Sequence, residues 1–375
     1  MKLSTLKSLS HSFLVLFILF SAQTAFADTG KAFSIKGKVT VNGEPMTLAT
    51  TLKAGDVIKT AKDSSVKVVM KDGTAIDILE NTEFKISKYS FKQDAPEESS
   101  SAFNLIGGAF RYVSGLIAKK DPSKVKLTAG TATIGIRGTF VDVSSPTSAG
   151  ISGAGDGGGN TLAVRTSIGA ATVTFPDGTS MNVASGQIGT RNLSTGVTAT
   201  NTSPPDAVAA AAIAMAADPA NAAAALSTMS AADAALAMAT LVNNAASLGA
   251  DTTALTQALS SVVTANPSLA TGLAYVTSAV SSDPTVSAAL TTAIKTAAPD
   301  QADAVDAASS SGDALEQAPP PSTSEFNLRV ATDGSVEVLD EDGEVIGTIE
   351  NTNPSGSPLT TEQIQEALEI INSGS

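Results

Sequence analysis

Two arginines in the first half of the chain are the residues best suited to bind a charged ligand or partner. Arg137 is the only charged side chain in the run 132–140, which otherwise holds small, β-branched and aromatic residues. A guanidinium buried in such a strand must contact a carboxylate, backbone carbonyls or an anionic ligand, because leaving it unpaired costs several kcal/mol. A carboxylate at a strand end is the favoured partner and an anionic ligand the alternative. Arg111 leaves the same two alternatives open. We therefore predict Arg137 and Arg111 as candidate ligand- or partner-binding residues.

Residue types that most catalytic and metal sites require are missing from the chain. It has no Cys, and its one His is His11. Disulfides, thiolate zinc sites, iron–sulfur ligation and a cysteine nucleophile are therefore excluded. A pair of carboxylates could still cleave a glycoside. However, Asp56, Asp72, Asp77 and Glu83 lie beside Gly turns or in short strands, where we expect solvated acids. We predict a protein that is not an enzyme and that binds no metal or cofactor.

Two loop segments match ligand-binding motifs only in part. The segment 150–160 contains the spacing G-x-G-x-x-G at Gly153, Gly155 and Gly158, but a strand pattern follows where a dinucleotide site needs a helix. The acidic run 340–344 lacks the alternating ligands of an EF-hand. We therefore expect a hairpin loop in the first case and a solvated acidic turn in the second.

The first 27 residues have the pattern of a secretory signal peptide. Lys2 and Lys7 precede a short apolar core at 13–20, and the small-x-small sequence at 25–27 precedes Asp28. The alternative is a retained membrane anchor, but the apolar run is shorter than the roughly 18 residues that span a bilayer. We expect a secreted chain that begins at Asp28, without a transmembrane segment or lipid anchor, in the periplasm or at the cell surface.

Residues 28–200 have the pattern of an antiparallel β-domain. Apolar and polar residues alternate, as at Val39 and Val41 or at Ile76 and Ile78, which is typical of half-buried strands. Dipeptides that favour tight hairpins separate several of these segments, namely Asn42-Gly43, Asp72-Gly73 and Asp177-Gly178. This spacing predicts an antiparallel sandwich or roll.

Residues 201–310 form an alanine-rich region that predicts short helices. Apolar residues recur at helical spacing, and Asp218-Pro219, Asn266-Pro267 and Asp283-Pro284 each place a capping residue before a proline in a first helical turn. The alternative is a partly helical polyalanine linker, because isolated short helices are marginal in water.

The rest of the chain consists of a predicted linker at 311–325 and an acidic module at 326–375. Alternating segments around Asp333-Gly334 and Asp342-Gly343 predict a small β-meander, and 360–371 predicts a closing helix. The last 75 residues carry one Lys or Arg against 15 acids, and the whole chain has a net charge of −13. This balance argues against nucleic-acid binding. The acidic tail either is solvated or contacts the slightly basic first domain.

A series of short motifs in the first domain resembles the FecR domain family. The motifs occur in the usual order of that family: 37–39 (GKV), 52–60 (LKAGDVIKT), 65–68 (SVKV), 72–74 (DGT), 107–111 (GGAFR), 132–140 (ATIGIRGTF), 161–166, 169–173 and 184–187 (ASGQ). The resemblance spans a little under half of the chain. It implies a mainly β domain within a multidomain chain that is first β and then α.

The resemblance also implies a place in the cell envelope. Founding members of the family are envelope regulators whose FecR domain lies in the periplasm and controls a sigma factor through a cytoplasmic segment and one membrane helix. Neither segment is expected here, so the anti-sigma role is not carried over. We predict an exported, non-enzymatic envelope protein whose FecR-like domain is a protein-interaction or regulatory module. The alternative is a surface-associated structural or glycan-binding assembly protein, and the expected partner is an envelope protein or a glycan.

Overall fold

The computed structural model describes residues 28–93, 95–145 and 160–314, together with three short strands at 327–330, 336–339 and 345–349. The predicted signal peptide, nearly all of the glycine-rich segment 150–160, the two predicted Asp-Gly turns of the last region and the predicted closing helix lie outside the described residues.

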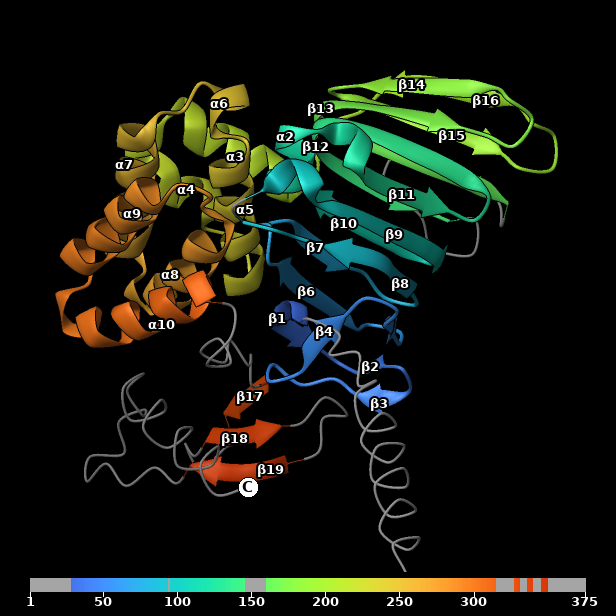
Figure 1. Cartoon of the computed structure of the whole chain (residues 1–375). Coiled ribbons are helices and arrows are strands. Elements are labelled where there is room, and N and C mark those ends of the chain that lie inside the picture. Colours follow the sequence, from blue (N-terminus) through green and yellow to red (C-terminus); the bar gives the residue numbers. More distant parts are fainter. Residues whose placement is uncertain are drawn as a thin grey trace, which may run out of the picture.

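The first part of the chain is a single large sheet that curls on itself (Figure 1). Its strands are β1 (Asp28–Lys36), β2 (Val39–Val41), β3 (Glu44–Pro45), β4 (Thr51–Lys53), β5 (Val57–Thr60), β6 (Ser65–Met70), β7 (Ala75–Ile78), β8 (Glu83–Ser90), β9 (Ser100–Gly107), β10 (Ala109–Val113), β11 (Val125–Ala129), β12 (Ala132–Ser144), β13 (Thr161–Thr174), β14 (Ser180–Ala184), β15 (Gln187–Asn192) and β16 (Thr198–Thr202).

The order of the strands makes the sheet mixed rather than purely antiparallel. Neighbours run β3-β2-β5-β8-β9-β11-β12-β10-β7-β6-β1-β4, and β13 continues from β12 to β14 and β15, with β16 outermost. Only β9 and β11 pair in parallel among the described strands. The chain crosses between them through β10, α2 (Leu116–Lys120) and the 3₁₀ turn Pro122–Lys124. Such a crossover permits a parallel pair, which a hairpin does not.

Tight turns lie where the sequence predicted them. Asn42 and Gly43 both have positive φ, 54° and 93°, between β2 and β3, as a two-residue hairpin turn requires. Gly178 closes the turn between β13 and β14. The predicted fold class, mainly β and then α, is confirmed.

The concave side of the curled sheet encloses an apolar core. Its centre is aromatic: Phe84 lies 5.9 Å from Phe103 and 5.1 Å from Phe110, and Tyr112 lies 6.1 Å from Phe103, measured between ring centroids. These side chains come from β8, β9 and β10 and are almost completely buried. Alternation along each strand sends them to this side and leaves the next residue on the opposite face.

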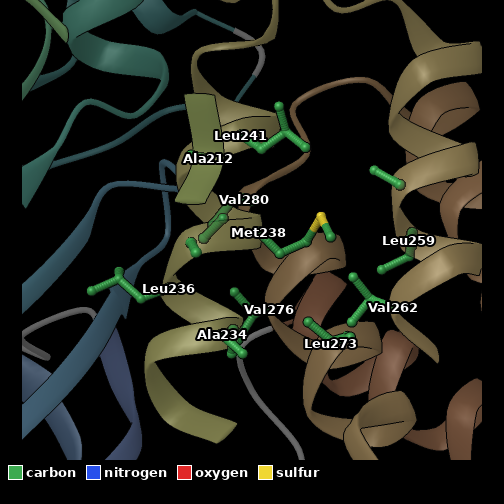
Figure 2. Close-up of a cluster of buried hydrophobic side chains, with 14 of the residues drawn as sticks. Ala212, Ala234, Leu236, Met238, Leu241, Leu259, Val262, Leu273, Val276 and Val280 are labelled. Carbon is green, nitrogen blue, oxygen red and sulfur yellow. The ribbon is translucent and has the colours of Figure 1, made fainter. Parts of the chain in front are cut away.

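The alanine-rich region folds into packed helices beside the sheet. They are α3 (Ala207–Ala217), α4 (Ala222–Leu226), α5 (Ala231–Asn243), α6 (Ala245–Leu248), α7 (Thr252–Ala265), α8 (Ala270–Val280), α9 (Pro284–Ala297) and α10 (Ala302–Ala314), with 3₁₀ turns at Pro219–Asn221, Pro267–Leu269 and Pro299–Gln301. Figure 2 shows Met238, Val262 and Leu273 pointing toward one another from α5, α7 and α8. Alanine leaves room for such close approach of helix backbones.

Helical segments begin at all three predicted Asp-Pro or Asn-Pro pairs, but the predicted side-chain cap forms at one of them. Asp283 caps α9 by accepting a hydrogen bond from the Thr285 amide at 2.8 Å, with Pro284 in the first turn. Asp218 and Asn266 instead precede 3₁₀ turns and make no capping hydrogen bond with their side chains. The prolines at 219 and 267 begin a 3₁₀ turn that leads into the following α-helix.

The helices and the convex face of the sheet share a second hydrophobic core, separate from the one on the concave side. Sheet residues on the convex face, such as Val69, Val113 and Phe140, belong to the same buried cluster as the helix residues. In Figure 1, α5 lies against β7, α8 against β6 and α3 against β13. Burying a Val, Leu or Phe side chain contributes about 1.5–3 kcal/mol. The helical region is therefore a packed layer on the sheet, unlike a polyalanine linker.

The last described segments form a three-stranded antiparallel meander. It consists of β17 (Asn327–Val330), β18 (Val336–Leu339) and β19 (Val345–Ile349), in that order. Within the part of the chain that the structure describes, none of the helices combines the length and the apolar character needed to cross a bilayer.

Candidate functional site

A row of alternating charges crosses five neighbouring strands on the convex face of the sheet. Lys67 of β6 lies directly opposite Asp77 of β7, which lies opposite Arg111 of β10. Arg111 in turn lies opposite Asp142 of β12, and Asp142 lies opposite Arg165 of β13. Cross-strand neighbours on one face are within contact distance. We call these five residues the charge ladder.

Each step of the charge ladder is an ion pair. The Lys67 Nζ is 3.4 Å from Asp77 Oδ1, and the Arg111 Nη1 is 2.6 Å from Asp77 Oδ2. Arg111 Nε and Arg165 Nε lie 3.3 and 2.8 Å from the two oxygens of Asp142. The Asp77 side chain is completely buried, and even the most accessible member, Arg111, is only 22% exposed. Partnered charges in such an environment lose much of their stabilisation when one partner is removed.

Two helix N-termini complete the charge ladder from the other side. Asp206 caps α3 by accepting from the Val208 amide, and its Oδ2 lies 3.0 Å from both Arg111 Nη2 and Arg165 Nη2. Asp142 and Asp206 thus each bridge the same two arginines, which closes a four-membered ring of charges. Asp233, in the first turn of α5, lies 3.1 Å from Lys67 Nζ. Lys67 and Arg165, at the two ends of the ladder, thus each gain a second carboxylate from a helix N-terminus.

The pKa values follow from burial and from these partners. Burial, and secondarily the neighbouring Asp206, raises the pKa of Asp142 to about 6, against the opposing effect of Arg165 and Arg111. Burial alone would lower the pKa of Arg111, but Asp77, Asp206 and Asp142 together hold it above its usual value. Lys67 has a raised pKa because Asp77 and Asp233 outweigh its burial. The raised pKa therefore brings the titration of Asp142 close to neutral pH.

A second polar contact joins the sheet to α5. The Lys119 Nζ donates to Asn243 Oδ1 at 2.8 Å, and Asn243 Nδ2 donates to the Gly73 carbonyl at 2.8 Å. Burial lowers the pKa of Lys119 to about 8. Gly73 has a φ of +75°, and a Cβ at this position would lie 3.0 Å from the backbone of Val280. The turn between β6 and β7 thus touches both α5 and α8.

The two predicted arginines have different surroundings. Arg111 is half-buried and contacts three carboxylates, so the favoured expectation of a structural partner describes its position. Arg137 is exposed on β12, and no ion pair within 4.0 Å is found for it among the described residues. The expectation that Arg137 is buried is wrong. Ile134 and Ile136 occupy the inward positions of β12, so Arg137 faces outward.

Two of the acids expected to be solvated are buried. Asp77 belongs to the charge ladder. Asp72 accepts hydrogen bonds from the Thr74 hydroxyl at 2.9 Å, the Tyr89 hydroxyl at 3.0 Å and the Ile117 amide at 3.3 Å. Burial, only partly offset by these bonds, raises the pKa of Asp72. Its oxygens hold the β6–β7 turn against β8 and α2. Within the described ranges, no group of three or more His, Cys, Asp or Glu residues could hold a metal ion.

The outer edge of β16 has no partner strand in the part of the chain that the structure describes. All five residues of β16 are exposed, and β15 is its one partner among the described strands. The Asn192 amide donates to the Val197 carbonyl and the Ser203 amide to the Gly186 carbonyl. Because antiparallel pairing alternates, the backbone groups of Thr198, Thr200 and Thr202 point away from β15.

Apolar side chains accompany this edge. Val197 is 66% exposed and Leu193 is 41% exposed, both at the turn that leads into β16. The strand itself contains no charge and no proline. Natural sheets usually protect exposed edges with charged residues, prolines or bulges. We call β16 together with Leu193 and Val197 the open edge.

Sequence reasoning missed the charge ladder and the open edge. The signal for the ladder was a charged residue within each largely apolar strand segment, at Lys67, Asp77, Asp142 and Arg165 as well as Arg111. The pairing of these positions depends on the strand order, in which β10 lies between β7 and β12. That order is not readable from local alternation.

Comparison with known proteins identifies part of the sheet. Residues 56–152 match a family model described as FecR protein. The chain therefore contains a FecR domain, which confirms the resemblance seen in the motifs. The matched residues include four members of the charge ladder, while Arg165 and Asp206 lie outside them. No curated protein matches the chain.

Two solved structures show a weaker similarity. Both are crystal structures described as a "putative anti-sigma factor" from Parabacteroides distasonis, with TM-scores of 0.32 and 0.31 and sequence identities of 14% and 13%. Each comparison covers 41% of this chain and 62% or 63% of the other. The chain thus matches less than two thirds of those proteins.

Proposed function

We propose that this chain is an exported, non-enzymatic cell-envelope protein whose FecR-containing sheet is a protein-interaction or regulatory module. The proposed partner is another envelope protein that adds an extended segment to the sheet at the open edge. The observation that carries the proposal is the fully exposed, uncharged strand β16, whose outward backbone groups can pair with such a segment.

The composition of the open edge favours a partner strand with apolar residues. Backbone pairing would supply affinity, and contacts with Leu193 and Val197 would supply selectivity. The charge ladder is an unsuitable docking surface, because the sheet and helices already bury it. Arg137 remains a proposed further contact, since an exposed guanidinium can pair with a carboxylate of the partner. Arg111 is instead proposed to position the helices.

Export is supported by the sequence pattern of residues 1–27, which is that of a secretory signal peptide. The absence of Cys, and of any His beyond position 11, supports a non-enzymatic role. Within these bounds, the periplasm or the cell surface is the proposed location.

The test uses the full chain and two variants of one residue in β16. Thr200→Pro removes the outward amide donor at the middle of the open edge, and proline is tolerated on edge strands. Thr200→Val keeps that donor and suits a strand equally well. Each protein is used to capture partners from the envelope fraction of the source organism, after circular dichroism has shown that it is folded.

We expect one saturable protein partner that binds the wild type and Thr200→Val but not Thr200→Pro. Hydrogen exchange of β16 amides should slow when the partner is added. A partner that binds Thr200→Pro equally well would show that the open edge is not the docking site. Capture of no protein by the wild type would contradict the interaction module itself.

A further inference from the structure

A cavity of about 600 Å³ lies at the seam between the sheet and the helices α8, α9 and α10. On the sheet side it is lined by Lys71 and Gly73 of the β6–β7 turn and by Phe91 after β8. On the other side it is lined by the end of α8 and by one face each of α9 and α10. The volume lies within the range of about 300–1,000 Å³ that is usual for small-molecule sites.

The helix side of this cavity is rich in hydroxyl groups. Eight of its lining residues are serine or threonine: Ser278, Ser281, Ser282, Ser287, Thr291, Thr292, Ser309 and Ser310. The Ser278 and Ser309 hydroxyls are 2.5 Å apart, Ser309 lies 2.7 Å from Thr291, and Ser287 donates to Ser278 at 3.3 Å. These bonds join three helices and fix the orientation of the inner hydroxyls. We call this space the hydroxyl cavity.

Three of these hydroxyls, those of Ser278, Ser287 and Ser309, are buried and bond to one another across helices, whereas the buried hydroxyls of Thr240 and Thr277 donate to a carbonyl of their own helix. Many other close contacts in the helices are made by alanine, as at Ala234, Ala258 and Ala274, which are all buried. A buried hydroxyl costs free energy unless it is hydrogen-bonded, whereas alanine does not carry that cost. Packing alone would therefore be served by alanine at these positions. Hydroxyls that both donate and accept suit a ligand that does the same, such as a sugar.

Among the charged residues that line the cavity, Lys71 can bind an anionic group of a ligand. Lys295 is paired with Asp306 at 2.5 Å, and the Asp72 carboxylate is held by Thr74, Tyr89 and the Ile117 amide. Lys71 also lines the cavity, and the structure gives it no carboxylate within 4.0 Å in the described part of the chain. Lys71 is thus available to a carboxylate of a ligand.

We infer that the hydroxyl cavity binds a single sugar unit that carries one carboxylate. The serine and threonine hydroxyls would bind the sugar hydroxyls, Lys71 would pair with the carboxylate, and the half-buried Phe91 ring would cover one face of the sugar. This inference goes beyond the proposed protein interaction and does not rest on it, because the cavity and the open edge are formed by different elements.

The test measures binding of two acidic sugars to the full chain by calorimetry. Glucuronic acid represents uronic acids of polysaccharides, and N-acetylmuramic acid represents cell-wall amino sugars; the better ligand indicates the source. Glucose and acetate control for the ring and for the acid alone. We expect saturable binding of at least one acidic sugar and about tenfold weaker binding of glucose, since a charge-assisted hydrogen bond is lost.

Two pairs of variants locate the site. Ala288→Trp fills the mouth of the cavity from an exposed position of α9 and should abolish binding, whereas Thr296→Trp lies on the same helix outside the lining and should not. Lys71→Gln should weaken binding of the acidic sugar about tenfold and leave glucose unchanged. Lys126→Gln, an exposed lysine of β11, is its control.

Either of two results would overturn the inference. One is the absence of saturable binding of both acidic sugars by the folded wild type. The other is binding that Ala288→Trp leaves unchanged, which would place the sugar elsewhere. Loss of partner capture by Thr200→Pro would bear only on the open edge.

Discussion

The sheet and the helices bury polar groups in different ways. Residues 28–200 carry 19 Lys and Arg and 15 Asp and Glu, whereas residues 201–300 carry one and six. The sheet buries several of its charges, among them Lys67, Asp77, Asp142 and Arg165. The helices bury alanine and larger apolar side chains together with a few hydroxyls and the amides of Asn243 and Asn244. A strand can hold a buried charge because its neighbours in the sheet provide partners at fixed positions, which closely packed helices lack.

Where the two regions meet, cations of the sheet pair with carboxylates of the helices. The sheet brings Arg111 and Arg165, and the helices bring Asp206 and Asp233 at their N-termini. A carboxylate at a helix N-terminus is also favoured by the helix dipole. The helices therefore stabilise the sheet that contains the FecR domain. A chain cut at the predicted boundary after residue 200 would lose both carboxylates and the end of β16.

The largest loss of stability is expected when the guanidinium of Arg111, at the centre of the charge ladder, is removed. Arg111→Met leaves Asp77, Asp142 and Asp206 with one cation fewer at the seam. We expect the free energy of unfolding in urea to fall by about 3–5 kcal/mol. Arg137→Met is the matched control on an exposed face of the same sheet and should change it by less than about 0.5 kcal/mol. Equal effects of the two variants would show that the ladder contributes little.

The second largest loss of stability is expected when the close packing of the helices is disturbed. Gly312 of α10 approaches α8 so closely that a Cβ would lie 2.3 Å from the Tyr275 carbonyl oxygen. Gly312→Ala should therefore destabilise the protein by about 2–3 kcal/mol through overpacking, although alanine usually favours a helix. Thr296→Ala, at an exposed position of α9, is the control. A neutral or stabilising Gly312→Ala would mean that α8 and α10 are less tightly packed than described. Thermal and urea unfolding both measure the difference.

The smallest expected effect is a pH dependence that belongs to the sheet. The pKa of Asp142 is raised to about 6 in the folded state, above its unfolded value, so the folded protein binds more protons between these values. The contribution of Asp142 to the free energy of unfolding is fully present below the unfolded pKa and is lost as pH rises through 6. We expect the stability difference between wild type and Asp142→Asn to fall by about 1–2 kcal/mol from pH 4 to pH 7. A difference that does not change with pH would contradict the raised pKa.

Sequence reasoning predicted what depends on local pattern. Alternation located the strands, Asn42-Gly43 located a hairpin turn, and alanine with apolar spacing located the helices. It failed for Arg137, because the apolar character of a strand does not decide its inward face; Ile134 and Ile136 do. It placed Asp72 and Asp77 at the surface, because the burial of these acids depends on elements that follow later in the chain, as with Ile117 and Arg111. The charge ladder and the hydroxyl cavity likewise depend on non-local pairing.

The central claim is that the sheet and the helices form one cooperative unit around the charge ladder. Native-state hydrogen exchange of the full chain tests it most directly, by comparing amides of β7 and β10 with amides of α5 and α8. We predict that the most protected amides of both regions open with the same free energy, and that Arg111→Met lowers both equally. The account would be contradicted if the helices opened at a much lower free energy that Arg111→Met left unchanged, because they would then be a separate attachment to the FecR domain.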